Sequence, residues 1–305
     1  MLQPTASSLT LDLLSTLRRG TMSVRALIEA GSLLGIEENN IRVSLARLYA
    51  SGRVERDDRG RYRLGPAVAA ISGRLRSWRE IGQRQIAWRG DWLAVHCARL
   101  GRGPARRRRE RALEFLGFRE IEAGFSLRPD NLRGGLDGAR EQLVSLATGV
   151  NATDTALGRV FLVRDLDPTS DMEARSLWDA AALADECRAS LTDLRKSEVR
   201  LANSTPEEAM IDSFLVGGRV LRQLVRHPLL PQEILTPAPL NDLLEAMKHY
   251  DTLGRDAWAT FLAKHDVPHR ALPLDTRAAD LAYSSAASPS RDEAVTPAPS
   301  HYRSN

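Results

Sequence analysis

The stretch from residue 20 to residue 64 constrains the fold of this 305-residue chain more than any other part. Apolar residues recur there at helical spacing in two segments, residues 23–34 and 37–52, with only a tight Gly-Ile turn between them. Two short alternating segments follow at residues 53–64, and Gly60 stands in their connection, where a hairpin usually needs a positive φ. The pattern predicts a helix-turn-helix followed by a β-hairpin, which is a winged helix.

The second of these helices combines an apolar stripe with a face that suits a DNA groove. Ile41, Leu45 and Leu48 lie within about 60° of one another on a helical wheel and predict the buried side. The other side offers amides that can read adenine, guanidinium groups for guanine or phosphate, and a branched apolar side chain for a thymine methyl. With the start of the first helix and the hairpin, the predicted DNA contacts are Ser23, Arg25, Asn39, Asn40, Arg42, Val43, Ser44, Arg47, Arg59 and Arg61.

The charge of the chain is unevenly distributed. Residues 1–120 hold 23 Lys or Arg against 12 Asp or Glu, whereas the remainder holds 20 against 27. A basic front half predicts that double-stranded DNA is bound mainly by the N-terminal part. Two plainer interpretations stay open, because winged helices also serve in protein interactions and exposed arginines often only solvate a surface.

The middle of the chain predicts a ferredoxin-like domain. Strands are expected at residues 92–97, 118–123, 125–127 and 156–163, and helices at 104–116 and 135–147. Strands and helices in the order β-α-β-β-α-β are typical of that arrangement.

The expected fold class is α+β, with five segments along the chain. They are a winged-helix domain at 1–72, a helical connector at 73–90, the ferredoxin-like domain at 91–168, a helical domain for dimerisation and effector binding at 169–283, and a tail at 284–305. The tail is rich in Ser, Ala and Pro and has too few apolar residues to bury a face, so it is expected to be disordered.

Several function classes are not expected. No run approaches the roughly 18 apolar residues of a membrane helix, and the N-terminus lacks the pattern of a secretory signal. Only Cys97 and Cys187 are present, which fits a reduced cytoplasm and excludes a four-cysteine zinc site. The end of the first middle strand, where the chain reads His96-Cys97-Ala98-Arg99, has no carboxylate for Mg²⁺. We therefore expect no metal, no cofactor and no catalytic set.

A resemblance to the PaaX family of transcriptional repressors rests on four segments. Residues 24–64 read VRALIEAGSLLGIEENNIRVSLARLYASGRVERDDRGRYRL and resemble the family's winged helix. The others are WRGDWLAVHCA at 88–98, LEFLGFREIEAGFSLRPDNL at 113–132 and HPLLPQEIL at 227–235. The likeness covers about residues 10–265, and it implies a winged helix, a ferredoxin-like middle domain and a helical C-terminal domain. Residues 98–103 and 236–240 depart from the family pattern, which bears on the effector more than on DNA binding.

The resemblance implies a repressor of a catabolic operon, notably for phenylacetate, that an aryl-CoA thioester releases from DNA. The densest run of positive charge in the chain is the candidate for binding the phosphates of such an acyl-CoA effector, and it consists of Arg106, Arg107, Arg108 and Arg109. The effector pocket is expected between the middle and C-terminal domains. A solvated helix start also explains the run. A homodimer is expected through apolar residues of the C-terminal helices: Leu215, Val216, Val220, Leu221 and Leu224. Two alternatives stay open. One is a DNA-binding regulator without a small-molecule effector, controlled by a protein partner, and the other is a CoA-thioester or nucleic-acid enzyme.

Overall fold

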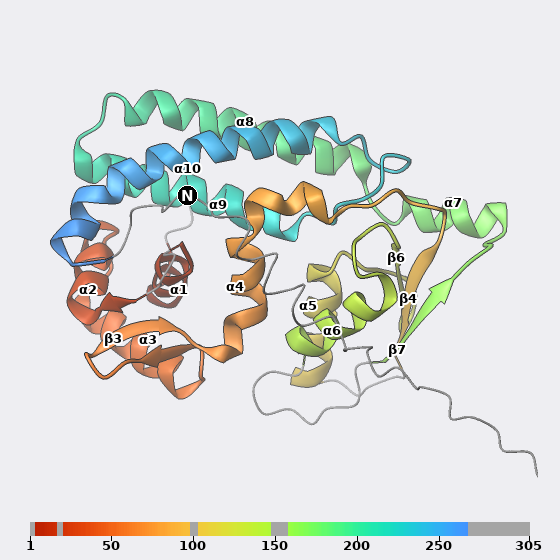
Figure 1. Cartoon of the computed structure of the whole chain (residues 1–305), viewed down its shortest axis with the longest axis horizontal. Coiled ribbons are helices and arrows are strands. Elements are labelled where there is room, and N and C mark those ends of the chain that lie inside the picture. The colour runs from red at the N-terminus through yellow and green to blue at the C-terminus, as the bar shows by residue number, and fades with distance from the viewer. Residues whose placement is uncertain (1–3, 17–20, 98–102, 148–157, 268–305) are drawn as a thin grey trace, which may run out of the picture. The chain divides into compact units, whose positions relative to one another are not determined.

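The computed structural model describes residues 4–16, 21–97, 103–147 and 158–267, all of which belong to one compact unit that spans Met1–His269. These residues form helices and two small antiparallel sheets, as expected for the α+β class (Figure 1). The predicted tail at 284–305 lies outside the described residues.

The N-terminal part contains one helix, α1, followed by the two helices and the hairpin that the sequence predicts. The helices are α1 (Ala6–Thr16), α2 (Val24–Leu33) and α3 (Glu38–Ala50), and the strands are β1 (Met22–Ser23), β2 (Val54–Arg56) and β3 (Arg61–Leu64) in the order β1-β3-β2. Ser23 begins α2 because its hydroxyl oxygen accepts a hydrogen bond from the Ala26 backbone N–H at 3.2 Å. Gly35 in the turn and Gly60 in the hairpin both have φ of +73°, which confirms the positive φ expected at Gly60.

A helical connector joins this part to the second sheet. It comprises a 3-10 turn, η1 (Pro66–Val68), then α4 (Ala69–Arg76) and η2 (Trp78–Arg84). Trp78 and Ile81 are buried in the same core as residues of the C-terminal helices. The connector is therefore packed along its length, and it is not an exposed linker.

The second sheet has two central strands and two edges. Its elements are β4 (Trp92–His96), α5 (Pro104–Phe115), β5 (Arg119–Glu122), β6 (Phe125–Pro129), α6 (Gly135–Ala147) and β7 (Arg159–Val163). The strand order is β5-β6-β4-β7, and every pair is antiparallel. Leu93 and Val95 of β4 pack against α5 and α6 on one face of the sheet. On the other face, the Trp92 ring stacks on the Trp178 ring, with 6.2 Å between the ring centres.

Two arginines, the half-buried Arg74 and the buried Arg128, hold the C-terminal end of α5. The Arg74 guanidinium of α4 donates to the Phe115 carbonyl at 3.1 Å, and the Arg128 guanidinium of β6 donates to the Leu116 carbonyl. Cations are favoured at a helix C-terminus, where carbonyl groups lack partners in the helix. Burial lowers the pKa of Arg74 to about 9 and that of Arg128 to about 10, so both stay charged at neutral pH.

The C-terminal helices pack side by side as a bundle. After α7 (Pro168–Ser176) come α8 (Ala180–Leu201), α9 (Pro206–Arg226) and α10 (Ala238–Lys264), and the last three contact one another (Figure 1). The residues expected to form a dimer interface lie inside this structure. Val216, Val220 and Leu224 are at most 2% exposed, and Leu215 and Leu221 pack half-buried against the cores. This interface prediction is wrong, because the same apolar face is needed to hold α9 against its neighbours.

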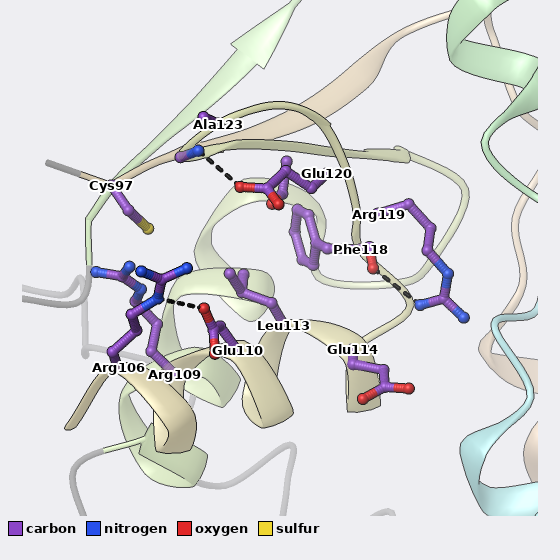
Figure 2. A pocket seen from close by; sticks show the side chains of 12 residues that line it. Cys97, Arg106, Arg109, Glu110, Leu113, Glu114, Phe118, Arg119, Glu120 and Ala123 are labelled. Carbon is purple, nitrogen blue, oxygen red and sulfur yellow. Dashed lines mark hydrogen bonds and ion pairs between the residues drawn. The ribbon is translucent and has the colours of Figure 1, made fainter. Parts of the chain in front are cut away.

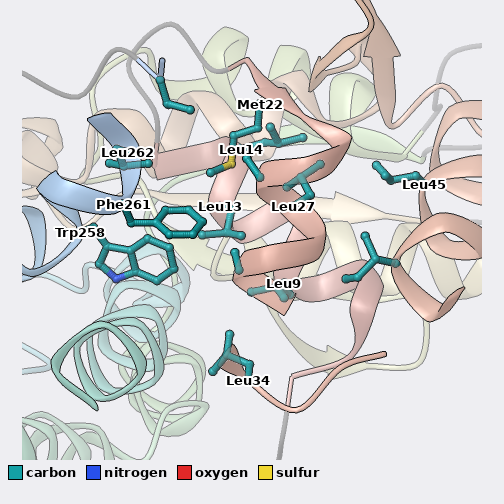
Figure 3. Packing of buried hydrophobic residues seen from close by; sticks show 14 of the residues in the cluster. Leu9, Leu13, Leu14, Met22, Leu27, Leu34, Leu45, Trp258, Phe261 and Leu262 are labelled. Carbon is teal, nitrogen blue, oxygen red and sulfur yellow. The ribbon is translucent and has the colours of Figure 1, made fainter. Parts of the chain in front are cut away.

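The winged helix shares its core with the C-terminal helices. Leu9, Leu13 and Leu14 of α1 lie in one cluster with Trp258 and Phe261 of α10, as Figure 3 shows. Three polar contacts surround this cluster: Arg222 with Asp12 at 2.7 Å, Lys264 with Glu29 at 2.5 Å, and the Arg61 guanidinium with the Asp266 carbonyl at 3.2 Å. The two ends of the described chain thus fold against each other.

Candidate nucleic-acid interface and arginine-lined pocket

The α3 helix has one buried and one exposed face. Ile41, Leu45 and Leu48 are at most 3% exposed and pack against α1 and α2. Gly31 of α2 lets Ile41 approach closely, since a Cβ atom at Gly31 would lie 3.0 Å from the Ile41 side chain. The exposed face of α3 presents Asn39, Asn40, Arg42, Val43, Ala46, Arg47 and Tyr49.

Ser44 differs from the other residues predicted to contact DNA. It is only 5% exposed, and its hydroxyl lies 2.7 Å from the Ser7 hydroxyl of α1. At 100° per residue, Ser44 lies about 40° from Leu48 on the helical wheel, at the border of the buried stripe. We therefore assign Ser44 to the contact between α1 and α3 and leave it out of the candidate interface.

The exposed face of α3 carries an ion pair whose arginine an anion can bind. Glu38 and Arg42 form an ion pair at 2.7 Å in which both side chains are more than half exposed. Such surface pairs contribute little free energy, so a phosphate or base can displace the carboxylate at small cost. Arg47 and Val43 stand further along the same exposed face.

Tyr49 is a residue that the sequence prediction missed. Its side chain is 58% exposed near the C-terminal end of α3, although a tyrosine in a globular domain is usually half-buried or more. On the wheel it lies about 20° from Arg42 and about 40° from Leu45, at the border of the buried stripe. The wheel alone therefore does not give its exposure, and Tyr49 belongs to the candidate interface because its side chain is exposed.

The tip of the hairpin is held by one carboxylate. Asp57 Oδ1 accepts hydrogen bonds from the backbone N–H groups of Arg59 at 3.0 Å and of Arg61 at 2.8 Å. The Arg59 side chain is exposed at this tip, whereas the Arg61 side chain is half-buried. Arg61 donates to the Thr21 hydroxyl, to the Thr21 carbonyl and to the Asp266 carbonyl. Arg59 is thus available to a phosphate, while Arg61 ties the hairpin to the rest of the fold.

The two residues near the start of α2 that were predicted to contact DNA, Ser23 and Arg25, have different roles in the structure. Ser23 uses its hydroxyl as the helix cap, and Arg25 is exposed in the first turn of the helix. Only Arg25 therefore has a side chain that is not engaged in capping.

A pocket of about 530 Å³ lies between α5 and the β5–β6 hairpin (Figure 2). Arg106 and Arg109 line it beside the Cys97 thiol, and Leu113 and Phe118 form its apolar wall. Of the four arginines predicted to bind an effector, only these two line the pocket, because Arg107 and Arg108 point to other sides of α5. The pocket lies within the middle part of the chain, not between the middle part and the C-terminal helices as expected.

The pocket has balanced charge. Its lining includes the guanidinium groups of Arg106, Arg109 and Arg119, and the carboxylates of Glu110, Glu114 and Glu120. Arg106 pairs with Glu110 at 2.6 Å, and Arg109 is only 7% exposed. Burial raises the pKa of the Cys97 thiol, so this group stays protonated at neutral pH and is a poor nucleophile.

Two further findings concern the described residues. They contain no group of three or more His, Cys, Asp or Glu side chains arranged to hold a metal ion. No helix among them is both long enough and apolar enough to cross a membrane.

Comparisons with known proteins bear on the same regions. The model of the PaaX-like protein family matches residues 5–67, which include α1, the helix-turn-helix and the hairpin. A solved structure, described as the uncharacterized protein Rv0674 from Mycobacterium tuberculosis, is 26% identical with a TM-score of 0.51, and the match covers 84% of this chain and 98% of that chain. No curated protein matches the chain. Residues 5–67 thus form a PaaX-like domain, which confirms the resemblance over the winged helix. The family model does not extend to the motifs at 88–98, 113–132 and 227–235.

Proposed function

We propose that the chain is a transcriptional regulator that binds operator DNA through α3 and the hairpin. The observation that carries the proposal is the exposed face of α3, which presents amide, guanidinium and apolar groups opposite the Ile41 stripe within a PaaX-like domain. In a winged helix-turn-helix this helix enters the major groove.

The chemistry of each exposed group suggests its role. Arg47 and Arg42 suit bidentate bonds to guanine, Asn39 and Asn40 suit adenine, and Val43, which is 41% exposed, suits the thymine methyl. Arg59 at the hairpin tip and Arg25 at the start of α2 suit the phosphates on either side of the groove. This division assigns sequence specificity to α3 and general affinity to the flanking arginines.

A mobility-shift assay with DNA from upstream of the protein's own gene tests this proposal. The protein should retard that fragment in the presence of excess unrelated DNA, and Arg47→Ala should weaken the shift. Arg107→Ala serves as the matched control, since it removes an exposed arginine from α5. Equal affinity of all three proteins for operator and unrelated DNA would overturn the assignment.

We extend the proposal to a repressor that an acyl- or aryl-CoA thioester releases from its operator. Support comes from the sequence resemblance and from the pocket, where Arg106 and Arg109 offer an anion-binding end next to the apolar wall of Leu113 and Phe118. An effector acts only if it binds the free and the DNA-bound states with different affinities. The hydrogen bond from Arg74 to the Phe115 carbonyl connects α5 to α4, which leads to the winged helix.

A panel of acyl-CoA esters, with free CoA and the free acids as controls, tests the effector. A suitable ester should raise the melting temperature and lower operator affinity, and Arg106→Ala should blunt both effects while Arg107→Ala leaves them intact. If the whole panel changes neither quantity, the regulator without a small-molecule effector becomes the better proposal.

A further inference from the structure

Two arginines lie side by side at the end of α5. The guanidinium groups of Arg74 and Arg128 donate hydrogen bonds to consecutive backbone carbonyls, those of Phe115 and Leu116. Their other side-chain hydrogen bonds also go to uncharged acceptors, which are Gln142 Oε1 for Arg74 and the Pro129 carbonyl and Asn131 Oδ1 for Arg128. Among the described residues, no carboxylate forms an ion pair with either arginine. Two positive charges therefore lie together with neutral partners only.

Arg84 adds a third positive charge. It ends η2, and its backbone carbonyl accepts a hydrogen bond from the Arg133 N–H at 2.8 Å, which holds this segment against the loop after β6. Burial is the main cause of the lowered pKa of Arg74 and of Arg128, and the positive charge of Arg84 is the second cause for both. A like charge has this effect at short range. The Arg84 side chain is half-buried, and within the part of the chain that the structure describes it has no hydrogen-bond or ion-pair partner.

The carboxylate that attracts Arg128 does not balance these charges. Asp130 is that carboxylate, and its buried Oδ1 has no hydrogen-bond partner among the described residues. Burial raises the pKa of Asp130, and the neighbouring Asp91 raises it further, so Asp130 is itself a poor holder of negative charge. Charges that are removed from water cost free energy unless an opposite charge lies close to them. The cluster thus has an excess of positive charge that an anion would balance.

We propose that Arg74, Arg84 and Arg128, which we call the junction arginines, bind a phosphate group, either as the free ion or as part of an organic phosphate. The half-buried Arg74 and Arg84 contact the anion, and the buried Arg128 adds its charge from the inner side. A phosphate suits three guanidinium groups better than a carboxylate does, because it carries more charge and more acceptor oxygens. None of the junction arginines lines the pocket between α5 and the β5–β6 hairpin, so this site is separate from that pocket and independent of the proposed function.

Thermal unfolding of the dialysed full-length protein tests the site. Inorganic phosphate, exchanged for chloride at constant ionic strength, should raise the melting temperature of the wild type along a curve that saturates. Phosphate also stabilises proteins by exclusion from their surface, which does not saturate, so only the saturable part counts. Arg84→Gln should lose the saturable part, whereas the matched control Arg107→Gln, which removes an exposed arginine from α5, should keep it. In chloride alone Arg84→Gln should melt at a higher temperature than the wild type, because one of three like charges is gone.

Calorimetric titration separates the two sources of the phosphate group. Inorganic phosphate and glycerol 3-phosphate are the two probes, and tighter binding of one identifies the free ion or an organic phosphate as the ligand. Circular dichroism of Arg84→Gln checks that the variant is folded. The absence of a saturable rise in the wild type would overturn the inference, and so would a lower melting temperature of Arg84→Gln in chloride. Equal phosphate binding by the wild type and Arg84→Gln would also overturn it, since the phosphate would then be an adventitious ion only.

Discussion

Arg47 and Ser44 lie three positions apart on α3 and make different contributions. Arg47 is exposed, whereas the Ser44 hydroxyl contacts that of Ser7 inside the fold. We expect Arg47→Ala to weaken specific binding by about 1–3 kcal/mol, the value of a bidentate base contact, and to leave the melting temperature unchanged. Ser44→Ala should leave specific DNA binding unchanged and should lower the free energy of unfolding by about 1 kcal/mol. Fluorescence anisotropy with operator DNA and thermal unfolding measure the two effects, and equal operator affinity for wild type and Arg47→Ala would contradict the first.

His227 predicts how the stability of the fold depends on pH. Burial lowers the pKa of His227 from 6.5 to about 4, and its Nδ1 accepts a hydrogen bond from the Leu229 N–H at 3.1 Å. In the unfolded chain His227 takes up a proton near pH 6.5, while in the folded chain it stays neutral until about pH 4. Stability is therefore complete above pH 6.5 and should fall by about 3 kcal/mol as the pH decreases to 4.

Denaturant titrations between pH 4 and pH 7 check this dependence. The His227→Asn variant is the control, because its side-chain oxygen can still accept the Leu229 N–H but does not titrate. The slope of stability against pH should be shallower in that variant than in the wild type. Parallel curves would show that other groups dominate.

Single residues also show which contacts can be read from a sequence. The helical wheel of α3 places Ser44 about 40° from Leu48 and Tyr49 about 40° from Leu45, at the two borders of the buried stripe. It therefore does not predict that Ser44 is buried and Tyr49 exposed, which depends on where α1 packs against α3. The role of Arg61 does not follow, because its partner Asp266 lies 205 residues further along the chain. Local periodicity carries no information about such a contact.

At the scale of the elements, two of the hairpin arginines, Arg59 and Arg61, have roles that an experiment can separate. Arg59→Ala should weaken binding to every DNA sequence and reduce the slope of log affinity against log salt by about 0.9, as expected for one lost phosphate contact. Arg61→Ala should instead lower the melting temperature, since it removes three hydrogen bonds to Thr21 and Asp266. Anisotropy titrations at several salt concentrations distinguish the two variants. An unchanged salt slope in Arg59→Ala would exclude a phosphate contact at the tip.

Helices and strands were predictable where capping and turn residues mark their ends. Ser23 and Gly60 mark α2 and the hairpin, and Pro104 marks the start of α5. The strand β1 was missed because it has only two residues and exists through its pairing with β3. The bulge in β5 was missed for a similar reason, since a register shift depends on the neighbouring strand β6.

At the scale of the whole molecule, the core shared by α1, α2 and α10 predicts one unfolding event. Phe261 is 7% exposed, and its ring lies 5.4 Å from that of Trp258 in the cluster that includes Leu9 and Leu13. Phe261→Ala should cost about 3–5 kcal/mol and should destabilise the winged helix and the C-terminal helices together. Calorimetry with hydrogen exchange measures both regions. The control is Val199→Ala, because the Val199 side chain on α8 is exposed. Loss of protection confined to α10 would contradict a shared core.

The shared core could not be derived from the sequence. The apolar stripes of α1 and α10 are both visible as helical periodicity, but neither stripe indicates which other helix packs against it. A division of the chain at residues 72 and 169 follows composition and local pattern, and these do not record which faces meet. Only the three-dimensional contacts show that Leu14 and Phe261 belong to the same cluster.

Because α1 and α10 share this core, the packing of α1 cannot be completed until the ribosome has synthesised α10. Trp258 follows Leu14 by 244 residues (258 − 14), and the two lie in one cluster. At about 5–20 residues per second, a ribosome needs roughly 10–50 s to add that length of chain. Throughout this interval the apolar face of α1 that α10 covers in the finished protein stays open. A chain whose synthesis stops before α10 therefore has a winged helix that is translated in full but still incomplete in its packing.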